Sequence, residues 1–231
     1  MKAILLALGL LLLVSCSAKQ TVKDGYQPLT AAEVTEALRD VLGRSIARSV
    51  AFAAVSGGFY DDPRLRIEFP PGTEKMQNTL RKLGFGAQID RTVLQMNRAA
   101  ELTASRARQS FLKAITALDI DDPFDVLNGS KDAATRLLRE ESGDDLYAEL
   151  EPFATNALIE TGAAQSYREL AEHYNGLPLV FDVDADIAAY LSEKTAAGLF
   201  VLMAQQEGQI RSIPAARSTR LMKRVFGSLD R

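Results

Sequence analysis

Two glutamates in expected helices are the residues best placed to do chemistry. Asn97 lies on the stripe of a long helix, and Glu101 follows one helical turn later at the edge of that stripe. A carboxylate that points into a core is costly unless it is paired and hydrogen-bonded. Arg139 and Arg211 are the candidate partners for Glu101. Glu207 and Arg211 are themselves four residues apart, a spacing that brings opposite charges together on one helix face.

Two interpretations of this candidate polar core site are open. One is a buried site that binds a small polar ligand. The other is an ion-pair network that fixes the register of the helices. Because no clear catalytic partner accompanies either glutamate, the network is the interpretation we favour.

A second constellation has the spacing of a calcium-binding loop. Asp182, Asp184, Asp186 and Glu193 occupy positions 1, 3, 5 and 12, as EF-hand ligands do. Position 6 requires glycine for a sharp turn, and here it is Ile187, which the following helix needs for its apolar stripe. We therefore expect Asp184 or Asp186 to cap that helix, and we predict no metal and no other cofactor.

Nucleophilic catalysis has few residues to draw on. The chain of 231 residues has one histidine, His173, one cysteine, Cys16, and no tryptophan. His173 stands in the last turn of an expected helix, where a histidine complements the helix dipole from the surface. The sequence has no phosphate-binding glycine loop and no dinucleotide fingerprint. These observations favour a binding protein over an enzyme.

The single cysteine predicts a targeting signal at the amino terminus. Met1-Lys2 precedes an apolar run, 3–14, that is too short to span a bilayer as a helix. The run ends in Leu13-Val14-Ser15-Cys16, which resembles the bacterial lipobox. We expect a lipoprotein signal peptide over 1–15, cleaved before Cys16, and acyl chains such as palmitate on that cysteine.

Residues 16–29 are then a lipidated tether that joins the domain to a membrane through Cys16. Ser17 stands where an aspartate would favour retention in the inner membrane, so we expect the periplasmic face of the outer membrane. The net charge is −3, with 27 basic and 30 acidic side chains, and it indicates no basic surface for nucleic acid. An unknown envelope protein or small ligand is the expected partner.

Helices must position these residues. Apolar side chains recur every three or four positions over 30–228, which predicts one mostly α domain of about seven to nine helices. The longest expected helix covers 88–118, and 187–211 is apolar nearly all round, as a central buried helix would be. Apolar alternation at 64–69 and an apolar run at 179–183 allow at most one short two-stranded β-ribbon.

Two further expectations concern the carboxyl-terminal half. Helix breaks are expected after Glu141 and near Pro152 and Gly162. A final helix over 214–226 would place three arginines on one basic face, namely Arg217, Arg220 and Arg224. Such a face is either solvated or in contact with anionic lipid.

Short motifs recur along the helical region in a combined order that is more specific than any motif alone. They are Asn97-Arg98-Ala99-Ala100-Glu101, Gly129, Ala133-Ala134-Thr135, Arg139, Tyr190, Lys194, Gly198-Leu199-Phe200, Glu207, Ile210-Arg211, Pro214 and Val225-Phe226-Gly227. Over about Thr30 to Gly227 the chain resembles the bacterial family known as domain of unknown function 4197. Leu137-Leu138 and Ala197 depart from the aromatic residues and the aspartate typical of that family. The resemblance implies a secreted, often lipid-anchored helical domain with no established activity.

The sequence therefore predicts a lipid-anchored, periplasm-facing helical protein that serves as a binding or interaction module of the bacterial cell envelope. One alternative is an envelope-acting hydrolase that uses Glu101 or Glu207 as general acid or base. It requires a water-accessible cleft around the carboxylate. The other alternative is a carrier of a lipid or other apolar ligand, which requires unfilled volume between helices.

Overall fold

The protein, seen in a computed structural model that describes residues 27–230, is built from helices. The expected signal peptide and residues 16–26 of the tether lie outside the described residues. The helices are α1 (Ala31–Ala53), α2 (Glu74–Lys82), α3 (Gly86–Ala117), α4 (Pro123–Asn128), α5 (Ala133–Glu160), α6 (Ala163–Asn175), α7 (Ala188–Ser212), α8 (Arg220–Phe226) and the short 3-10 helices η1 (Pro214–Ala216) and η2 (Gly227–Asp230). The prediction of a mostly α single domain is confirmed.

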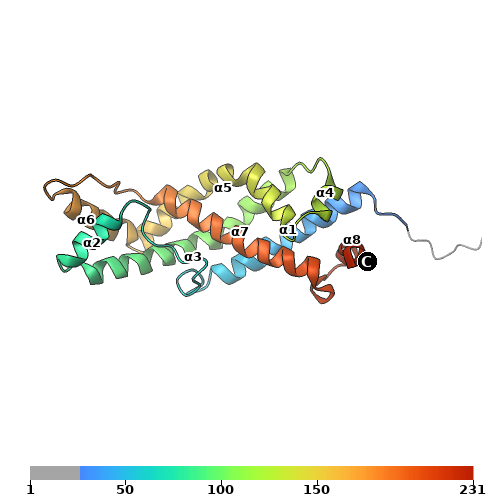
Figure 1. The fold of residues 1–231 in the computed structure, drawn as a ribbon, viewed down its shortest axis with the longest axis horizontal. Helices are drawn as coiled ribbons and strands as arrows, with labels where there is room; N and C mark the ends of the chain where they lie inside the picture. Colours follow the sequence, from blue (N-terminus) through green and yellow to red (C-terminus); the bar gives the residue numbers. More distant parts are fainter. Residues whose placement is uncertain (1–26, 231) are drawn as a thin grey trace, which may run out of the picture.

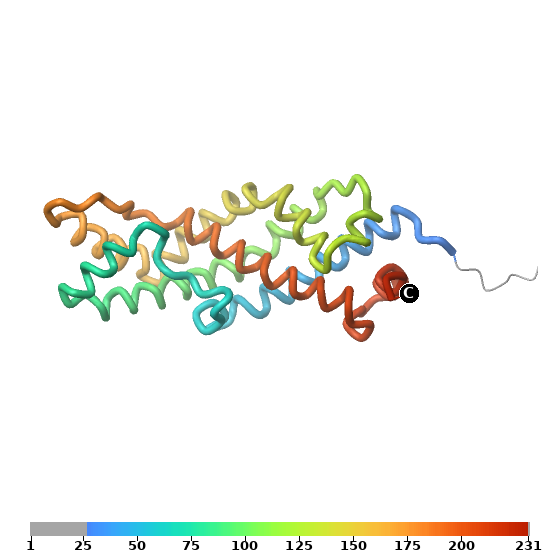
Figure 2. The backbone as a smooth tube through the Cα atoms, in the orientation of Figure 1, coloured from blue at the N-terminus to red at the C-terminus, as the bar shows by residue number. Residues whose placement is uncertain are grey.

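Four long helices, α1, α3, α5 and α7, form an elongated bundle in which consecutive members run in alternate directions (Figure 1). Each long helix packs against two neighbours, and α3 and α7 also meet across the bundle. One end of the bundle, which we call the base, contains α4, α8 and the first residues of α1 (Figure 2). At the other end, which we call the tip, lie α2, α6 and the connection between α6 and α7. With 32 residues, α3 alone is about 48 Å long.

The first helix begins as its sequence indicates. The side chain of Thr30 accepts a hydrogen bond from the amide of Glu33 at 3.2 Å, and the Glu33 carboxylate accepts one from the amide of Thr30 at 3.0 Å. This reciprocal capping box satisfies two amides that would otherwise lack partners at the start of α1.

The expected breaks after Glu141 and at Pro152 are wrong, because α5 runs unbroken through both positions. Pro152 has no N–H to donate to the carbonyl of Ala148. The helix survives because it packs along α3 and α7, and the hydroxyl of Ser192 donates to the adjacent carbonyl of Tyr147. The expected break at Gly162 is confirmed, since this residue adopts a φ of 76° between α5 and α6.

The β-ribbon between 64–69 and 179–183 does not form, and residues 27–230 contain no β-strand. The first segment begins in a turn, where the amides of Leu65 and Arg66 donate to the carbonyl of Asp62, and it buries Leu65, Ile67 and Phe69 in alternation, as its pattern indicates. The amide and carbonyl of Ile67 bind the side chain of Asn97, on α3, in place of a second strand. The second segment lies at the tip, where another asparagine holds it.

The expected basic face of a final helix is also wrong. The chain turns at η1 and restarts only at Thr219, whose side chain accepts from the amide of Met222, so Arg217 precedes α8. Arg217 is buried, and its guanidinium donates to the carbonyls of Ile210 and Arg211 and to the carboxylate of Asp230. This arginine therefore fastens the chain end to α7.

Candidate functional site

Four of the five candidate residues of the polar core fall into two separate groups. Asn97 and Glu101, on α3, bind the connection 54–73 between α1 and α2. Glu207 and Arg211, on α7, bind the junction between α4 and α5. Arg139 lies exposed on α5, and among the described residues it forms no ion pair with either glutamate. The expected pairing of Glu101 with Arg139 or Arg211 is therefore wrong, since Glu101 pairs with Arg98 and Arg211 pairs with Glu207.

Glu101 holds the first turn of the connection. Its Oε1 accepts hydrogen bonds from the amides of Gly57 at 3.0 Å and Phe59 at 3.4 Å, while its Oε2 pairs with Arg98 at 2.8 Å. Gly57 adopts a φ of 91°, which glycine accepts without strain, and this conformation helps direct its amide at the carboxylate. Glu101 is 4% exposed, but the side chain of Arg98 is 38% exposed, so one partner of the pair reaches water.

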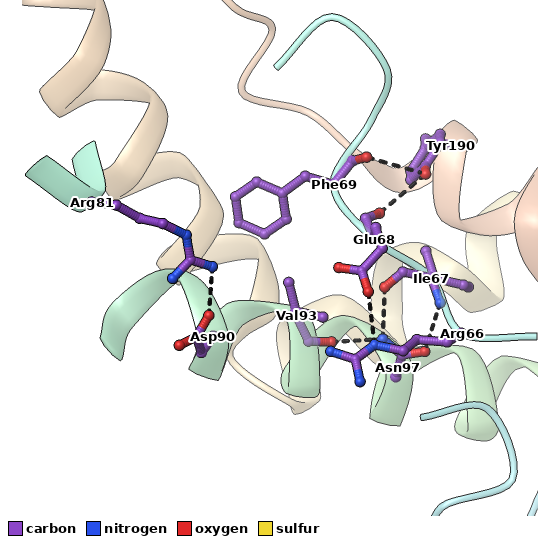
Figure 3. Close-up of polar contacts among 9 residues, drawn as sticks. All are labelled: Arg66, Ile67, Glu68, Phe69, Arg81, Asp90, Val93, Asn97 and Tyr190. Carbon is purple, nitrogen blue, oxygen red and sulfur yellow. Dashed lines mark hydrogen bonds and ion pairs between the residues drawn. The ribbon is translucent and has the colours of Figure 1, made fainter. Parts of the chain in front are cut away.

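Asn97 replaces a missing β-strand (Figure 3). Its Oδ1 accepts from the amide of Ile67 at 2.8 Å, and its Nδ2 donates to the carbonyl of Ile67 at 2.7 Å. The same Nδ2 donates to the carbonyl of Val93 at 2.8 Å. All three hydrogen bonds of the Asn97 side chain bind backbone groups of the protein. Since Asn97 is also fully buried, no ligand can reach its side chain.

A stripe on α7 contacts the same connection from the opposite side. The hydroxyl of Tyr190 donates to the carbonyl of Glu68 at 3.0 Å (Figure 3), and Lys194 Nζ lies 5.5 Å from the Tyr190 ring centroid. At Gly198 any Cβ would lie 2.9 Å from the ring of Phe59, so only glycine allows this approach. We call the residues that hold the connection the loop site: Asn97, Arg98, Glu101, Tyr190 and Gly198.

Glu207 caps α5 from another helix. It is fully buried, and its Oε1 accepts from the amide of Ala134 at 3.0 Å and from Arg211 Nε at 2.8 Å. Its Oε2 accepts from the amide of Thr135 at 2.8 Å and from the hydroxyl of Thr135 at 2.7 Å. Asp132, at the N-cap of α5, makes no side-chain capping bond, so the carboxylate of Glu207 takes that role.

Arg211 places a positive charge at the carboxyl end of α4. Its two terminal nitrogens donate to the carbonyls of Leu127 at 2.6 Å and Val126 at 3.1 Å, and its guanidinium lies 5.5 Å from the Phe226 ring centroid. A cation at a helix carboxyl end and an anion at a helix amino end are both favourable. We call Glu207 and Arg211, with the helix ends they bind, the junction site.

Neither site offers free acid–base chemistry. Every oxygen of Glu101 and Glu207 accepts a bond from the protein, and Glu207 has no exposed surface. Burial, with Asp184 and Tyr190 as lesser contributors, raises the pKa of Tyr167 to about 12. Burial, followed by Glu193 and Glu68, also raises the pKa of Tyr190. Both tyrosines are therefore neutral at physiological pH. The loop site and the junction site thus serve to position the backbone.

Asp184 and Asp186 close local turns before α7, whose N-cap is Ile187 and has no side-chain capping bond. Asp184 Oδ1 accepts from the amide of Asp186 at 2.9 Å, and Asp186 Oδ1 accepts from the amide of Ala188 at 2.8 Å. Residues 27–230 contain no group of three or more histidine, cysteine or acidic side chains placed to hold a metal ion. His173 is exposed in the last turn of α6, where its ring packs against Phe85 at 4.9 Å. Cys16 lies outside the described residues.

The tip contains a feature that the sequence patterns missed. Asn175 closes the α6–α7 loop by accepting from the amide of Val183 and donating to its carbonyl, both at 3.0 Å. Between them Leu179 is 99% exposed and Phe181 is 85% exposed. Leu179 adopts a φ of 62°, a costly conformation for a leucine. Asn175-Gly176 looks in sequence like a helix end only, and the exposure of the loop has no local signature.

An all-helical bundle whose buried charges hold a loop and a helix junction is thus the class of protein that the fold defines. The chain belongs to the family described as protein of unknown function (DUF4197), whose sequence model matches residues 28–227, and the resemblance inferred from the motifs is confirmed. Comparisons with curated proteins and with solved structures give no match. No helix within residues 27–230 combines the length and the hydropathy needed to cross a bilayer.

Proposed function

We propose that this protein is a lipid-anchored, periplasm-facing binding module of the bacterial cell envelope, attached by Cys16 to the outer membrane. The observation that carries the proposal is that the two ends of the bundle differ. The start of the described chain, which follows the expected anchor, lies at the base (Figure 1). The exposed Leu179 and Phe181 lie at the tip, so the apolar surface is presented far from the anchored end.

The two alternatives receive less support from the geometry. A hydrolase needs a carboxylate that water and substrate can reach, whereas Glu207 is sealed and Glu101 already binds two amides and an arginine. A carrier of apolar ligands needs a cavity between helices. The core stripes of the long helices are instead filled by buried side chains, and the grooves near Arg106, Lys113, Lys131 and Arg168 open to solvent with charged residues in their walls.

The anchor is tested by replacing Cys16 in the full chain. The Cys16→Ser variant is expected to appear unprocessed or in the soluble fraction, while Ser17→Ala, a change at the next residue, stays with the outer membrane. Mass spectrometry of the mature amino terminus should find acyl chains only when the cysteine is present. If Cys16→Ser fractionates with membranes as the parent does, the anchor is wrong.

The binding role of the tip is tested by photo-crosslinking in intact cells. A photoreactive amino acid at Phe181 should give discrete adducts. The same amino acid at Ile213, which is 48% exposed at the carboxyl end of α7, serves as the control and should not give them. Identical adducts from both positions, or none from Phe181, would overturn the role of the tip.

A further inference from the structure

A groove near the tip has walls that carry charges of both signs. It has a volume of about 310 Å³ and lies between the end of α5, the start of α6 and the residues that lead into α7. Arg168, on α6, contributes a guanidinium to the wall, and Asp184 and Asp186 contribute two carboxylates from the connection before α7. Binding sites for small molecules have volumes of roughly 300–1,000 Å³, so this groove has room for one small molecule.

Apolar side chains line the rest of the groove. Leu158, on α5, and Ile187, just before α7, are each 2% exposed, so the groove reaches down to the edge of the core. Ala164 and Ala188 add only methyl groups to the lining and leave the space between the helices open. A cavity of about 150 Å³ is large enough to admit benzene, so an aliphatic side chain fits here together with a polar group.

The charges in the walls are not paired with one another. In the part of the chain that the structure describes, Arg168 forms no hydrogen bond and no ion pair, although two carboxylates line the same groove. Asp184 and Asp186 each use Oδ1 to accept a backbone amide, at 2.9 Å and 2.8 Å, while Oδ2 of each accepts no hydrogen bond from the described residues. Local turns therefore hold both carboxylates in place, and each keeps one oxygen for a ligand.

We propose that this groove binds an α-amino acid with an apolar side chain. The ammonium group of the ligand donates to Asp184 and Asp186, its carboxylate accepts two hydrogen bonds from Arg168, and its side chain lies on Leu158 and Ile187. The site goes beyond the proposed function, because it adds a small-molecule ligand to the binding module.

The charge balance of the groove selects a ligand with both charges over a ligand with one. The walls carry two negative charges and one positive charge. A simple carboxylate would bring an anion close to two aspartates, and a simple amine would leave Arg168 without a partner. An amino acid satisfies both walls. All three charged side chains are exposed, so each contact adds only modestly to the affinity.

The test is a titration of the full-length anchored chain, purified in detergent, with L-leucine followed by NMR of the ligand. Isopentylamine is leucine without its carboxylate, and 4-methylpentanoate is leucine without its amino group. Both keep the apolar part of the ligand, and each should bind about fivefold to tenfold more weakly than leucine. Empty detergent micelles are the blank and should give no saturable signal.

Substitutions in the groove identify the two charged contacts. Arg168→Gln should weaken the binding of leucine by about fivefold to tenfold without weakening that of isopentylamine, which has no carboxylate. Asp184→Asn combined with Asp186→Asn should weaken the binding of both, while the asparagine oxygens still accept the two backbone amides. Arg136→Gln and Asp121→Asn change exposed residues outside the groove, serve as matched controls and should change nothing.

Three results would overturn the amino acid as the ligand. They are leucine that shows no saturable binding, either truncated probe binding as tightly as leucine, or Arg168→Gln binding leucine as the parent chain does. The anchor and the role of the tip are tested separately, by Cys16→Ser and by crosslinking at Phe181, so they do not depend on this result.

Discussion

Glu101 and Glu207 are both buried carboxylates on long helices, yet their surroundings differ in one respect. Each accepts two backbone amides and pairs with an arginine on its own helix. The arginine that pairs with Glu101 has a side chain 38% exposed, whereas the one that pairs with Glu207 is 5% exposed. The Glu101–Arg98 pair therefore reaches solvent through its arginine, whereas the Glu207–Arg211 pair is almost fully buried.

The difference teaches that the cost of breaking a buried pair depends on the partner left behind. An uncompensated charge is expensive in a dry site and inexpensive where water can reach it. The junction site should therefore tolerate substitution poorly. The loop site should tolerate changes at its arginine better than changes at its carboxylate.

The largest expected effect is that of Arg211→Met. The substitution leaves the charge of Glu207 buried without a counter-ion and the carbonyls of Val126 and Leu127 without donors. The free energy of unfolding should fall by about 3–5 kcal/mol, measured by urea denaturation followed by circular dichroism. A loss below about 1 kcal/mol would erase the distinction between the two sites.

A smaller effect is expected for Glu101→Gln. The amide can still accept from Gly57, but the charge-assisted bonds are lost, and Arg98 is free to remain in water. We expect a loss of about 1–3 kcal/mol, less than for Glu207→Gln, which strands the buried charge of Arg211. Glu193→Gln changes an exposed glutamate and controls for net charge. Equal losses at the two buried glutamates would contradict the comparison.

Arg98→Met should have a minor effect. Its partner Glu101 retains both amide bonds, and its own side chain is already partly hydrated. A partly exposed pair contributes about 0–1 kcal/mol, so the unfolding midpoint in urea should barely move. If Arg98→Met matched Arg211→Met, exposure of the arginine would not decide the cost.

A pH-dependent effect is expected at a third carboxylate, which lies on the surface but pairs with the buried Arg217. A hydrogen bond from Arg217 lowers the pKa of Asp230 below its ordinary value of 3.8. A lowered pKa means that the contribution of this carboxylate to stability is fully present above pH 3.8 and is lost as the pH falls through the lower folded value. The stability difference between the parent and Asp230→Asn should therefore shrink on acidification. A difference that grows towards low pH would contradict this assignment.

Much of the fold follows from local patterns. The three- and four-residue apolar periodicity finds the long helices, the Thr30–Glu33 pair finds the start of α1, and Gly162 marks a true break. The break predicted at Pro152 fails because proline acts on one hydrogen bond, while packing against two helices acts along all of α5. A local pattern does not contain that packing.

The site was predictable where its partners lie on one helix. The spacing of Glu207 and Arg211 correctly indicates a pair, and the periodicity correctly places Asn97 and Glu101 against the core. The predicted pairing of Arg139 with Glu101 is wrong because the sequence of a helix does not determine its distance from another helix. Likewise, the alternation at 64–69 correctly indicates which side chains are buried, but the backbone begins in a turn, and the side chain of Asn97 binds the backbone of Ile67 where a second strand was expected.

The junction site also bears on the order in which the protein folds. Glu207 meets its amide partners across 72 and 73 residues, and Arg211 meets its carbonyl partners across 84 and 85. Contacts between such distant parts of a chain form slowly, because a long loop must close first. In a chain synthesised from its amino end, α4 and α5 emerge well before α7. The start of α5 therefore lacks its cap until the last long helix has been made.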